Sequence, residues 1–251
     1  MQVLILAGGE GTRLKPFTNV IPKPLVPIGD LPILEVVLRQ LKSHGADRIV
    51  LAVNKLARLI EAFFGDGSRL GLKISYSLED TPLGTAGPIR LVSELDEDFI
   101  LMNGDLLTTI DYSDFFRRHK IGGATASIAT FQKEIKIDLG VLETKEGELT
   151  NYIEKPTYHF TVSMGIYALN RRAIDFIPDG TKFDMPDLVL ALHKSGEKLL
   201  CYSGDYDWLD IGRIDDYETA VELFETNRNA YLPVSDVKNV GNCHESGTLA
   251  K

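Results

Sequence analysis

Runs of Val, Ile and Leu alternate along the first half of the chain with segments whose apolar residues recur at helical spacing. This alternation predicts an α/β fold in which parallel strands are joined by helices. The expected strands are residues 2–7, 48–53, 72–77 and 98–103, and the expected helices are residues 31–43, 55–64 and 86–95. We therefore expect a Rossmann-like, mixed but mainly parallel sheet flanked by helices.

From about residue 123 the pattern changes, and antiparallel strands are expected to join the sheet. Strand-like runs occupy 124–130, 139–143 and 160–169, and helical spacing follows at 184–194 and 213–227. Neither a linker nor a repeat divides residues 1–232, which predicts one mixed domain. Residues 233–251 are polar and contain few large apolar side chains, as in a mobile tail or a foreign appendage.

The acidic balance of the chain limits the partners it can have. Lys and Arg number 27 against 36 Asp and Glu in 251 residues, a net charge of −9. This charge disfavours binding to nucleic acid or to an anionic membrane. The absence of a long apolar run and the presence of only two cysteines predict a cytoplasmic protein in a reducing compartment. The five histidines show no paired ligand spacing and are expected at the surface or at helix ends.

One segment opposes the acidic balance. Residues 8–28 hold three cations, Arg13, Lys15 and Lys23, against the single acid Glu10. This segment includes a glycine-rich loop directly after the first strand, Leu6-Ala-Gly-Gly-Glu-Gly-Thr-Arg-Leu14. Glycines allow consecutive backbone N–H groups to approach phosphate oxygens, and Arg13 adds a forked cationic donor. The loop therefore predicts a phosphate cradle, and its alternative is a structural glycine turn.

Two familiar phosphate loops do not match this segment. A dinucleotide fingerprint needs a small residue where Leu14 stands, and a Walker loop needs a Gly-Lys-Ser/Thr sequence that is absent. Shortly after the loop, Lys23 stands between Pro22 and Pro24, which fix the local backbone. Lys23 is thus a candidate phosphate ligand held in place, and the alternative is an incidental lysine in an exposed turn.

The order of these residues resembles the N-terminal signature of the sugar-phosphate nucleotidyltransferases, also called nucleoside-diphosphate-sugar pyrophosphorylases. The similar part comprises Gly8 to Leu14, Pro16, Thr18 and Pro22 to Leu25. Further segments also agree, at residues 82–87, 103–105, 154–156, 165–167 and 208–212. The pattern is most similar to mannose-1-phosphate guanylyltransferase-like enzymes. It implies the nucleotide-diphospho-sugar transferase type of fold over nearly all of residues 1–232.

Two aspartates follow apolar runs, so they are expected at the carboxyl edge of the sheet. Asp105 comes after the run 99–102, and Asp210 ends another short run. Carboxylates from separate strand ends can hold one Mg²⁺ that bridges substrate phosphates. The resemblance implies this metal role for both. Taken singly, each aspartate could instead form an Asx turn or a helix cap.

The resemblance also implies two groups of substrate-binding residues. The nucleotide side comprises Ala7, Gly8, Gly9, Gly11, Thr12, Glu79, Gly84 and Thr85, although Gly84-Thr85 could simply be a turn with a helix cap. The sugar-phosphate side comprises Gly140, Glu154, Lys155 and Gly165. Ser163-Met164 stands where many relatives have Asn-Ala, which leaves the identity of the sugar open.

The implied activity is Mg²⁺-dependent transfer of a nucleoside monophosphate from an NTP to a sugar 1-phosphate, with release of pyrophosphate. Arg13 and Lys23 would be the catalytic residues. GTP is the first candidate donor, followed by UTP and CTP. The alternatives are a non-sugar phosphate acceptor, a sugar transferase that consumes a nucleotide sugar, and an inactive regulatory relative. A homodimer is expected, with no nucleic acid and no membrane as partner.

Overall fold

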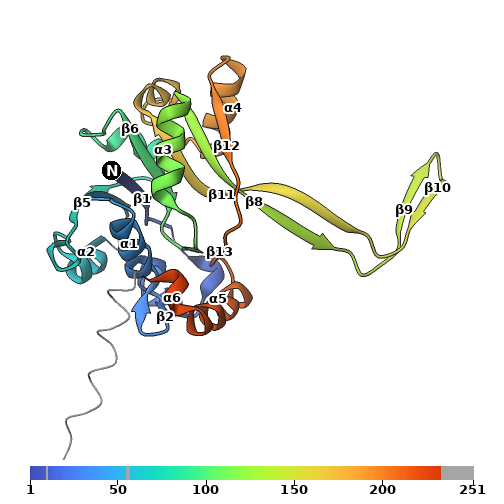
Figure 1. Ribbon diagram of the computed structural model, residues 1–251, viewed down its shortest axis with the longest axis horizontal. Coiled ribbons are helices and arrows are strands. Elements are labelled where there is room, and N and C mark those ends of the chain that lie inside the picture. Colours follow the sequence, from blue (N-terminus) through green and yellow to red (C-terminus); the bar gives the residue numbers. More distant parts are fainter. Residues whose placement is uncertain (10, 55–56, 233–251) are drawn as a thin grey trace, which may run out of the picture.

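A seven-stranded mixed sheet runs through the body of the protein in the computed structural model, which describes residues 1–9, 11–54 and 57–232 (Figure 1). The strand order is β12-β8-β11-β6-β1-β4-β5. The strands are β1 (Gln2–Leu6), β4 (Arg48–Val53), β5 (Lys73–Leu78), β6 (Asp98–Asn103), β8 (Ala126–Lys136), β11 (Thr157–Asn170) and β12 (Leu199–Tyr202). Four of the six neighbouring pairs are parallel, and β11 runs antiparallel to both β6 and β8. The expected mixed, mainly parallel sheet is confirmed.

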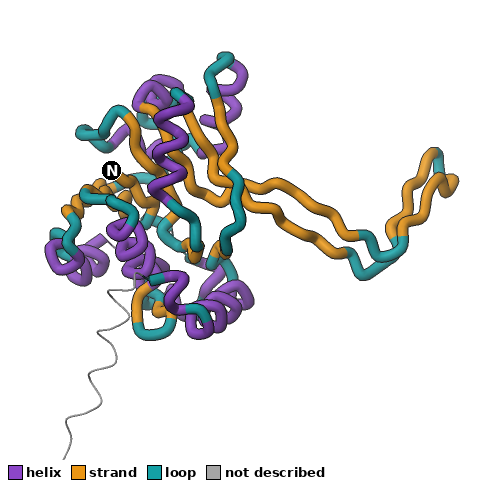
Figure 2. Tube along the Cα trace, viewed as in Figure 1, coloured by secondary structure: helices purple, strands orange, loops and turns teal. Residues whose placement is uncertain are grey.

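Helices cover both faces of this sheet, which explains why its central strands are continuously apolar. On one face lie α1 (Ile33–Ser43), α2 (Ala57–Phe64) and α3 (Tyr112–Gly122). The other face packs against α4 (Met185–Lys194) and short 3₁₀ turns (Figure 2). As a result Val3, Leu4 and Ile5 of β1 are fully buried.

A smaller apolar cluster lies beside the carboxyl edge of the sheet. It joins the start of α1 to α5 (Ile214–Thr226) and α6 (Arg228–Tyr231). Two short two-stranded sheets support it: β2 (Pro27–Ile28) with β3 (Leu31–Pro32), and β7 (Leu106–Thr108) with β13 (Trp208–Asp210). The pairing of β13 with β7 positions Asp210, one of the two predicted metal ligands.

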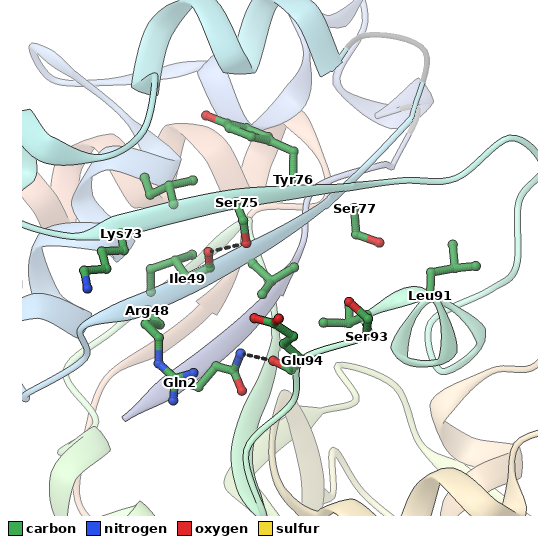
Figure 3. A pocket seen from close by; sticks show the side chains of 13 residues that line it. Gln2, Arg48, Ile49, Lys73, Ser75, Tyr76, Ser77, Leu91, Ser93 and Glu94 are labelled. Carbon is green, nitrogen blue, oxygen red and sulfur yellow. Dashed lines mark hydrogen bonds between the residues drawn. The ribbon is translucent and has the colours of Figure 1, made fainter.

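The helix expected at 86–95 is wrong. The structure has only a 3₁₀ turn, Gly87–Leu91, and Val92 is extended. The N–H groups of Ala86 and Gly87 donate to the carbonyl of Phe183 instead of opening an α-helix, and Pro88 has no N–H to give. Because this turn is short, part of the sheet stays open as a hollow of about 350 Å³ near the first residues of β1, β4 and β5 (Figure 3). None of the predicted site residues lines it.

The second half of the chain departs further from expectation. β8 and β11 continue well beyond the sheet as a two-stranded ribbon, which carries a hairpin of β9 (Val141–Lys145) and β10 (Glu148–Ile153) (Figure 1). We call residues 131–162 the arm. The strand expected at 139–143 thus pairs with β10 outside the main sheet. The expected tail, 233–251, and Glu10 lie outside the described residues.

Within the described ranges, no helix combines the length and the apolarity that crossing a lipid bilayer requires.

Candidate functional site

The glycine-rich loop leaves β1 at the carboxyl edge of the sheet and turns sharply at Gly11. Gly11 has a φ of +59°, and a Cβ there would come within 2.8 Å of the Thr18 methyl group. The Thr18 hydroxyl donates to the Gly11 carbonyl at 2.7 Å. Gly9, by contrast, is exposed with open space around its Cα. The turn is therefore fixed from behind while its outer side stays accessible to a ligand.

Residues at the ends of β4 and β5 support the start of this loop. The Asn54 side-chain amide donates to the Gly8 carbonyl, and a Glu79 carboxylate oxygen lies 3.5 Å from where a Cβ on Gly8 would stand. Burial raises the pKa of Glu79, and the Leu83 N–H, which donates to the carboxylate at 3.1 Å, opposes that shift. Glu79, which the resemblance assigns to the nucleotide side, thus lies beside the glycine-rich loop. Asn54 was missed, although its place after a parallel strand could have indicated it.

Lys23 is held inside the protein. It begins the 3₁₀ turn Lys23–Leu25, is only 9% exposed and forms an ion pair with one carboxylate oxygen of Asp105. The other oxygen, Oδ1 of Asp105, is buried without a hydrogen-bond partner within the described part of the chain. A buried carboxylate oxygen of this kind is an acceptor that the folded chain leaves unused.

Asp210 joins this group through the pairing of β13 with β7. Asp210 lies opposite Leu106, and the Ile211 N–H donates to the Asp105 carbonyl at 3.1 Å. Burial raises the pKa of Asp210 and the Asp105 charge raises it further, while Lys23 and Arg13 lower it. The Arg13 guanidinium lies 3.6 Å from where a Cβ on Gly212 would stand, so that glycine leaves room for it.

The two carboxylates fit a divalent cation that also binds a substrate. Asp105 offers its unpaired Oδ1. Asp210 lies close enough that the negative charge of Asp105 disfavours ionisation of Asp210, and a bound cation would offset this repulsion. In the described ranges, no group of three or more His, Cys, Asp and Glu side chains could enclose a metal. Mg²⁺ commonly takes only one or two protein carboxylates and completes its shell with water and phosphate. The residues therefore fit Mg²⁺ better than a fully protein-enclosed ion.

The predicted nucleoside loop is anchored to the start of α4. Gly84 has a φ of +82°, and a Cβ there would collide with Asp184 and the Phe183 carbonyl, each at 2.6 Å. The Thr85 hydroxyl accepts from the Met185 N–H at 2.7 Å. Asp184 accepts from the Thr85 N–H at 3.0 Å. The hydroxyl of Thr85 thus caps α4 rather than the segment that follows Thr85. Thr85 and Met185 are 100 positions apart, and no local pattern indicates this contact.

Of the four residues predicted to bind the sugar phosphate, only Gly165 lies on the body, at the edge of the sheet where the glycine-rich loop also lies. Gly165, at a bulge in β11 with a φ of +73°, packs so closely that a Cβ would come within 2.7 Å of the Asn103 amide. Asn103 ends β6, two residues before Asp105. Gly165 therefore lines the edge from which the arm departs.

The other three, Gly140, Glu154 and Lys155, lie together on the arm. The Tyr152 hydroxyl donates to the Glu154 carboxylate at 2.9 Å and occupies the place where a Cβ on Gly140 would be. Lys155 has a φ of +44°, which is unfavourable for a side chain with a Cβ. The cluster is held by this hydrogen bond and contains one strained backbone position. It lies on the arm, away from the body of the protein (Figure 1).

An α/β sheet that gathers cations and carboxylates around a glycine loop at its carboxyl edge is typical of enzymes that act on nucleotide phosphates. The family model described as nucleotidyl transferase matches residues 2–227. The chain belongs to this family, that of the sugar-phosphate nucleotidyltransferases, and is an enzyme of the nucleotidyltransferase class.

Two curated relatives illustrate the likeness. A UTP–glucose-1-phosphate uridylyltransferase of Synechocystis sp. is 34% identical, over 95% of this chain and 67% of the relative. A mannose-1-phosphate guanyltransferase of Yarrowia lipolytica is 32% identical, over 94% of this chain and 69% of the relative. The chain thus spans about two thirds of the length of these proteins.

Solved structures agree on the fold. A putative glucose-1-phosphate thymidylyltransferase from Bacillus anthracis has a TM-score of 0.73 at 22% identity and covers 89% of this chain and 94% of its own. HddC from Yersinia pseudotuberculosis, complexed with GMP-PN, has a TM-score of 0.68 at 27% identity and covers 89% of this chain and 99% of its own.

Proposed function

We propose that this protein transfers a nucleoside monophosphate from an NTP, with GTP favoured, to a sugar 1-phosphate in a Mg²⁺-dependent reaction. The observation that carries the proposal is the convergence of Arg13, Lys23, Asp105 and Asp210 beside the glycine loop. These two cations and two carboxylates come from elements up to about 200 residues apart in the chain. Packing of the sheet alone does not require them to meet at one edge, whereas binding of a phosphate ligand would.

The donor is held from the body of the protein. The N–H groups of the Gly8–Gly11 loop and the Arg13 guanidinium bind the β- and γ-phosphates, and Lys23 binds the α-phosphate. Asp105 and Asp210 hold Mg²⁺. When bound there, the ion neutralises charge on the phosphate oxygens and on the leaving pyrophosphate. Ala7, Thr12, Glu79, Gly84 and Thr85 complete the nucleotide side.

The reaction needs no protein nucleophile. A sugar-phosphate oxygen, already an anion at neutral pH, forms a bond to the α-phosphorus as the bond from that phosphorus to the bridging oxygen breaks. Pyrophosphate leaves with the electron pair of the broken bond, and the nucleoside monophosphate stays on the sugar phosphate. The work of the chain is to bring two polyanions together and to stabilise the charge of the transition state.

The acceptor is held by Gly140, Glu154, Lys155 and Gly165. Glu154 accepts hydrogen bonds from sugar hydroxyls, and Lys155 binds the attacking phosphate. The contact between Tyr152 and Glu154 and the left-handed backbone of Lys155 support this assignment, because strained residues tend to be retained where they act.

GTP is favoured over UTP as donor on the likeness to the guanylyltransferase and to the structure complexed with GMP-PN. The relative that is 34% identical uses UTP by its name, so UTP is the main rival. Mannose, glucosamine and heptose 1-phosphates are the first acceptors to test, with phosphocholine as a non-sugar acceptor.

The test is pyrophosphate release across four NTPs and this acceptor panel, each with Mg²⁺ and with EDTA. We expect release that needs one NTP, one sugar 1-phosphate and the metal ion together. Release that needs no acceptor would indicate an NTP pyrophosphohydrolase, and activity in EDTA would contradict the metal assignment. Equal rates with phosphocholine would move the acceptor out of the sugar class.

A further inference from the structure

The arm carries its acceptor-binding cluster away from the body. Its two strands stay paired without interruption from Thr157 opposite Lys136 to Ser163 opposite Thr130. At about 3.4 Å per residue this ladder alone is about 20 Å long, before the hairpin begins. β9 and β10 form a sheet of their own beyond it (Figure 2).

The surface of the arm carries several exposed apolar side chains among its charged ones. Of the sixteen large apolar side chains that are exposed in the described part of the chain, six lie on the arm: Ile135, Leu139, Leu142, Leu149, Tyr152 and Phe160. The β9–β10 register places Leu142 opposite Tyr152 and Leu149 opposite Thr144, so these residues share one face of the hairpin. An isolated two-stranded hairpin is at best marginally stable in water, so this face calls for a covering surface.

A matching apolar surface borders the phosphate loop of the body. Phe17, Val20 and Ile21, between Arg13 and Lys23, are 42%, 79% and 39% exposed. They form an apolar rim on the loop whose Thr18 packs against Gly11 of the phosphate loop. An acceptor cluster docked on this rim would bring Lys155 toward Lys23.

We propose that two copies of this chain exchange arms, so that the hairpin of each docks on the residue 17–21 loop of the other and supplies Glu154 and Lys155 to the other copy's site. This inference rests on the proposed acceptor role of these two residues. The chemistry requires the acceptor phosphate and the α-phosphate in contact, yet the straight ladder separates the two halves of the site within one chain.

The root of the arm makes a closed, symmetric exchange possible. The arm leaves the sheet at the bulge between Ser163 and Tyr167, where Gly165 packs on Asn103 at the edge of the site. Two copies related by a two-fold axis, with their sites facing, would each receive the arm that starts beside the other's site. Folding back onto its own body would instead require a sharp bend at this bulge.

Complementation between two inactive variants tests the exchange. Asp105→Asn disables the body site, and Glu154→Gln with Lys155→Met disables the arm. In mixed dimers one site has both defects and the other has none. Mixing equal amounts, with time for subunits to exchange, should therefore restore about a quarter of the wild-type rate, measured with the acceptor below its KM. A mixture no more active than the average of the two variants alone contradicts the exchange.

Sedimentation velocity tests the same contact without any enzyme assay. Wild type should sediment as a dimer, and Leu149→Asp on the arm or Val20→Asp on the loop should each raise the dimer dissociation constant at least about tenfold. Ile121→Asp is the matched control, because Ile121 is 75% exposed at the end of α3. A monomeric wild type, or a dimer indifferent to both variants, overturns the proposal. If wild type lacks transferase activity, the proposed function fails while sedimentation still decides on the exchange.

Discussion

At the scale of single residues, Lys23 has two partners in this account. In the structure it neutralises Asp105, and in the proposed reaction it binds the α-phosphate. Both are possible because Pro22 and Pro24 fix the backbone on either side while the lysine side chain keeps its own rotamers. In the proposed reaction Asp105 would hold the metal ion, and the Lys23 ammonium would be free to pair with the α-phosphate.

Lys23→Met should lower the rate of pyrophosphate release at least about tenfold, because the cation on the α-phosphate is lost. It should also lower Tm by roughly 3–10 °C, since Asp105 is left charged and buried without its partner. Steady-state kinetics and calorimetry measure the two effects. Adding Asp105→Asn should recover most of the Tm and none of the rate. A single variant within twofold of the wild-type rate would exclude Lys23 from the reaction.

Asp105→Asn and Asp210→Asn should each reduce turnover at least about a hundredfold, since both carboxylates are needed for the metal ion. Their effects on stability should differ. The pKa of Asp210 is raised in the folded protein, so at neutral pH the ionised carboxylate destabilises the folded state. Asp210→Asn should therefore not lower Tm at neutral pH. Asp105→Asn should lower Tm, because Lys23 loses its partner. Mg²⁺ titrations of rate and thermal melts separate these outcomes.

The sequence indicated that the two aspartates lie at or just after the ends of strands, but it did not indicate their contacts. Asp105 could be placed by the rule that ligands gather at strand ends. The ion pair with Lys23 could not, because it depends on how the turn that buries Lys23 packs against a residue 82 positions further along the chain. For the same reason the cap that Thr85 provides to α4 was not predictable from its local sequence.

At the scale of elements, the strands and long helices followed from their apolar spacing, and the two departures have local causes. Pro88 and the bonds to Phe183 stop the helix expected at 86–95. The arm escaped prediction because its residues alternate as any strand does, and alternation does not say what, if anything, covers each face.

His119 shows how an element is held in place. It was expected at the surface or at a helix end; it lies in the last turn of α3, and there it is buried. Its Nδ1 lies 2.8 Å from the Ser127 hydroxyl, and its Nε2 lies 3.4 Å from Asp98. Burial lowers the pKa of His119, and the Asp98 carboxylate only partly opposes the shift.

Stability should therefore fall as the pH drops below about 6.5, because the unfolded chain then takes up a proton that the folded His119 resists. His119→Gln should flatten the fall of Tm between about pH 7 and pH 5. Melting curves across this range are the measurement, with the exposed His193→Gln as control. Parallel Tm profiles for wild type and His119→Gln would show that another group is responsible.

Lys155→Met should raise the KM for the sugar phosphate about ten- to a hundredfold and change the KM for the NTP little. The methionine keeps the apolar stem and removes only the charge. The residues proposed to bind the nucleotide lie on the body while Lys155 lies on the arm, so the two constants should separate. Initial rates with each substrate varied in turn provide the test. An equal rise in the NTP constant would place Lys155 in the nucleotide site.

At the scale of the whole molecule, the body and the arm divide the proposed reaction between them. In the proposal the donor would bind to the body, at the carboxyl edge of the seven-stranded sheet, and the acceptor to the arm that carries β9 and β10. The pattern of apolar positions correctly indicated an α/β fold with a mixed, mainly parallel sheet. It could not indicate this division, because the division arises from how far β8 and β11 run past the sheet.

Labelled phosphorus atoms of the donor report which bond the proposed transfer breaks. With GTP, Mg²⁺ and mannose 1-phosphate, or the donor and acceptor that the panel selects, an α-³²P label should appear in the nucleotide sugar and a γ-³²P label in pyrophosphate. This distribution requires attack at the α-phosphorus by the acceptor phosphate. A γ-label in orthophosphate or on the acceptor, or an α-label that never joins the sugar, would contradict the account.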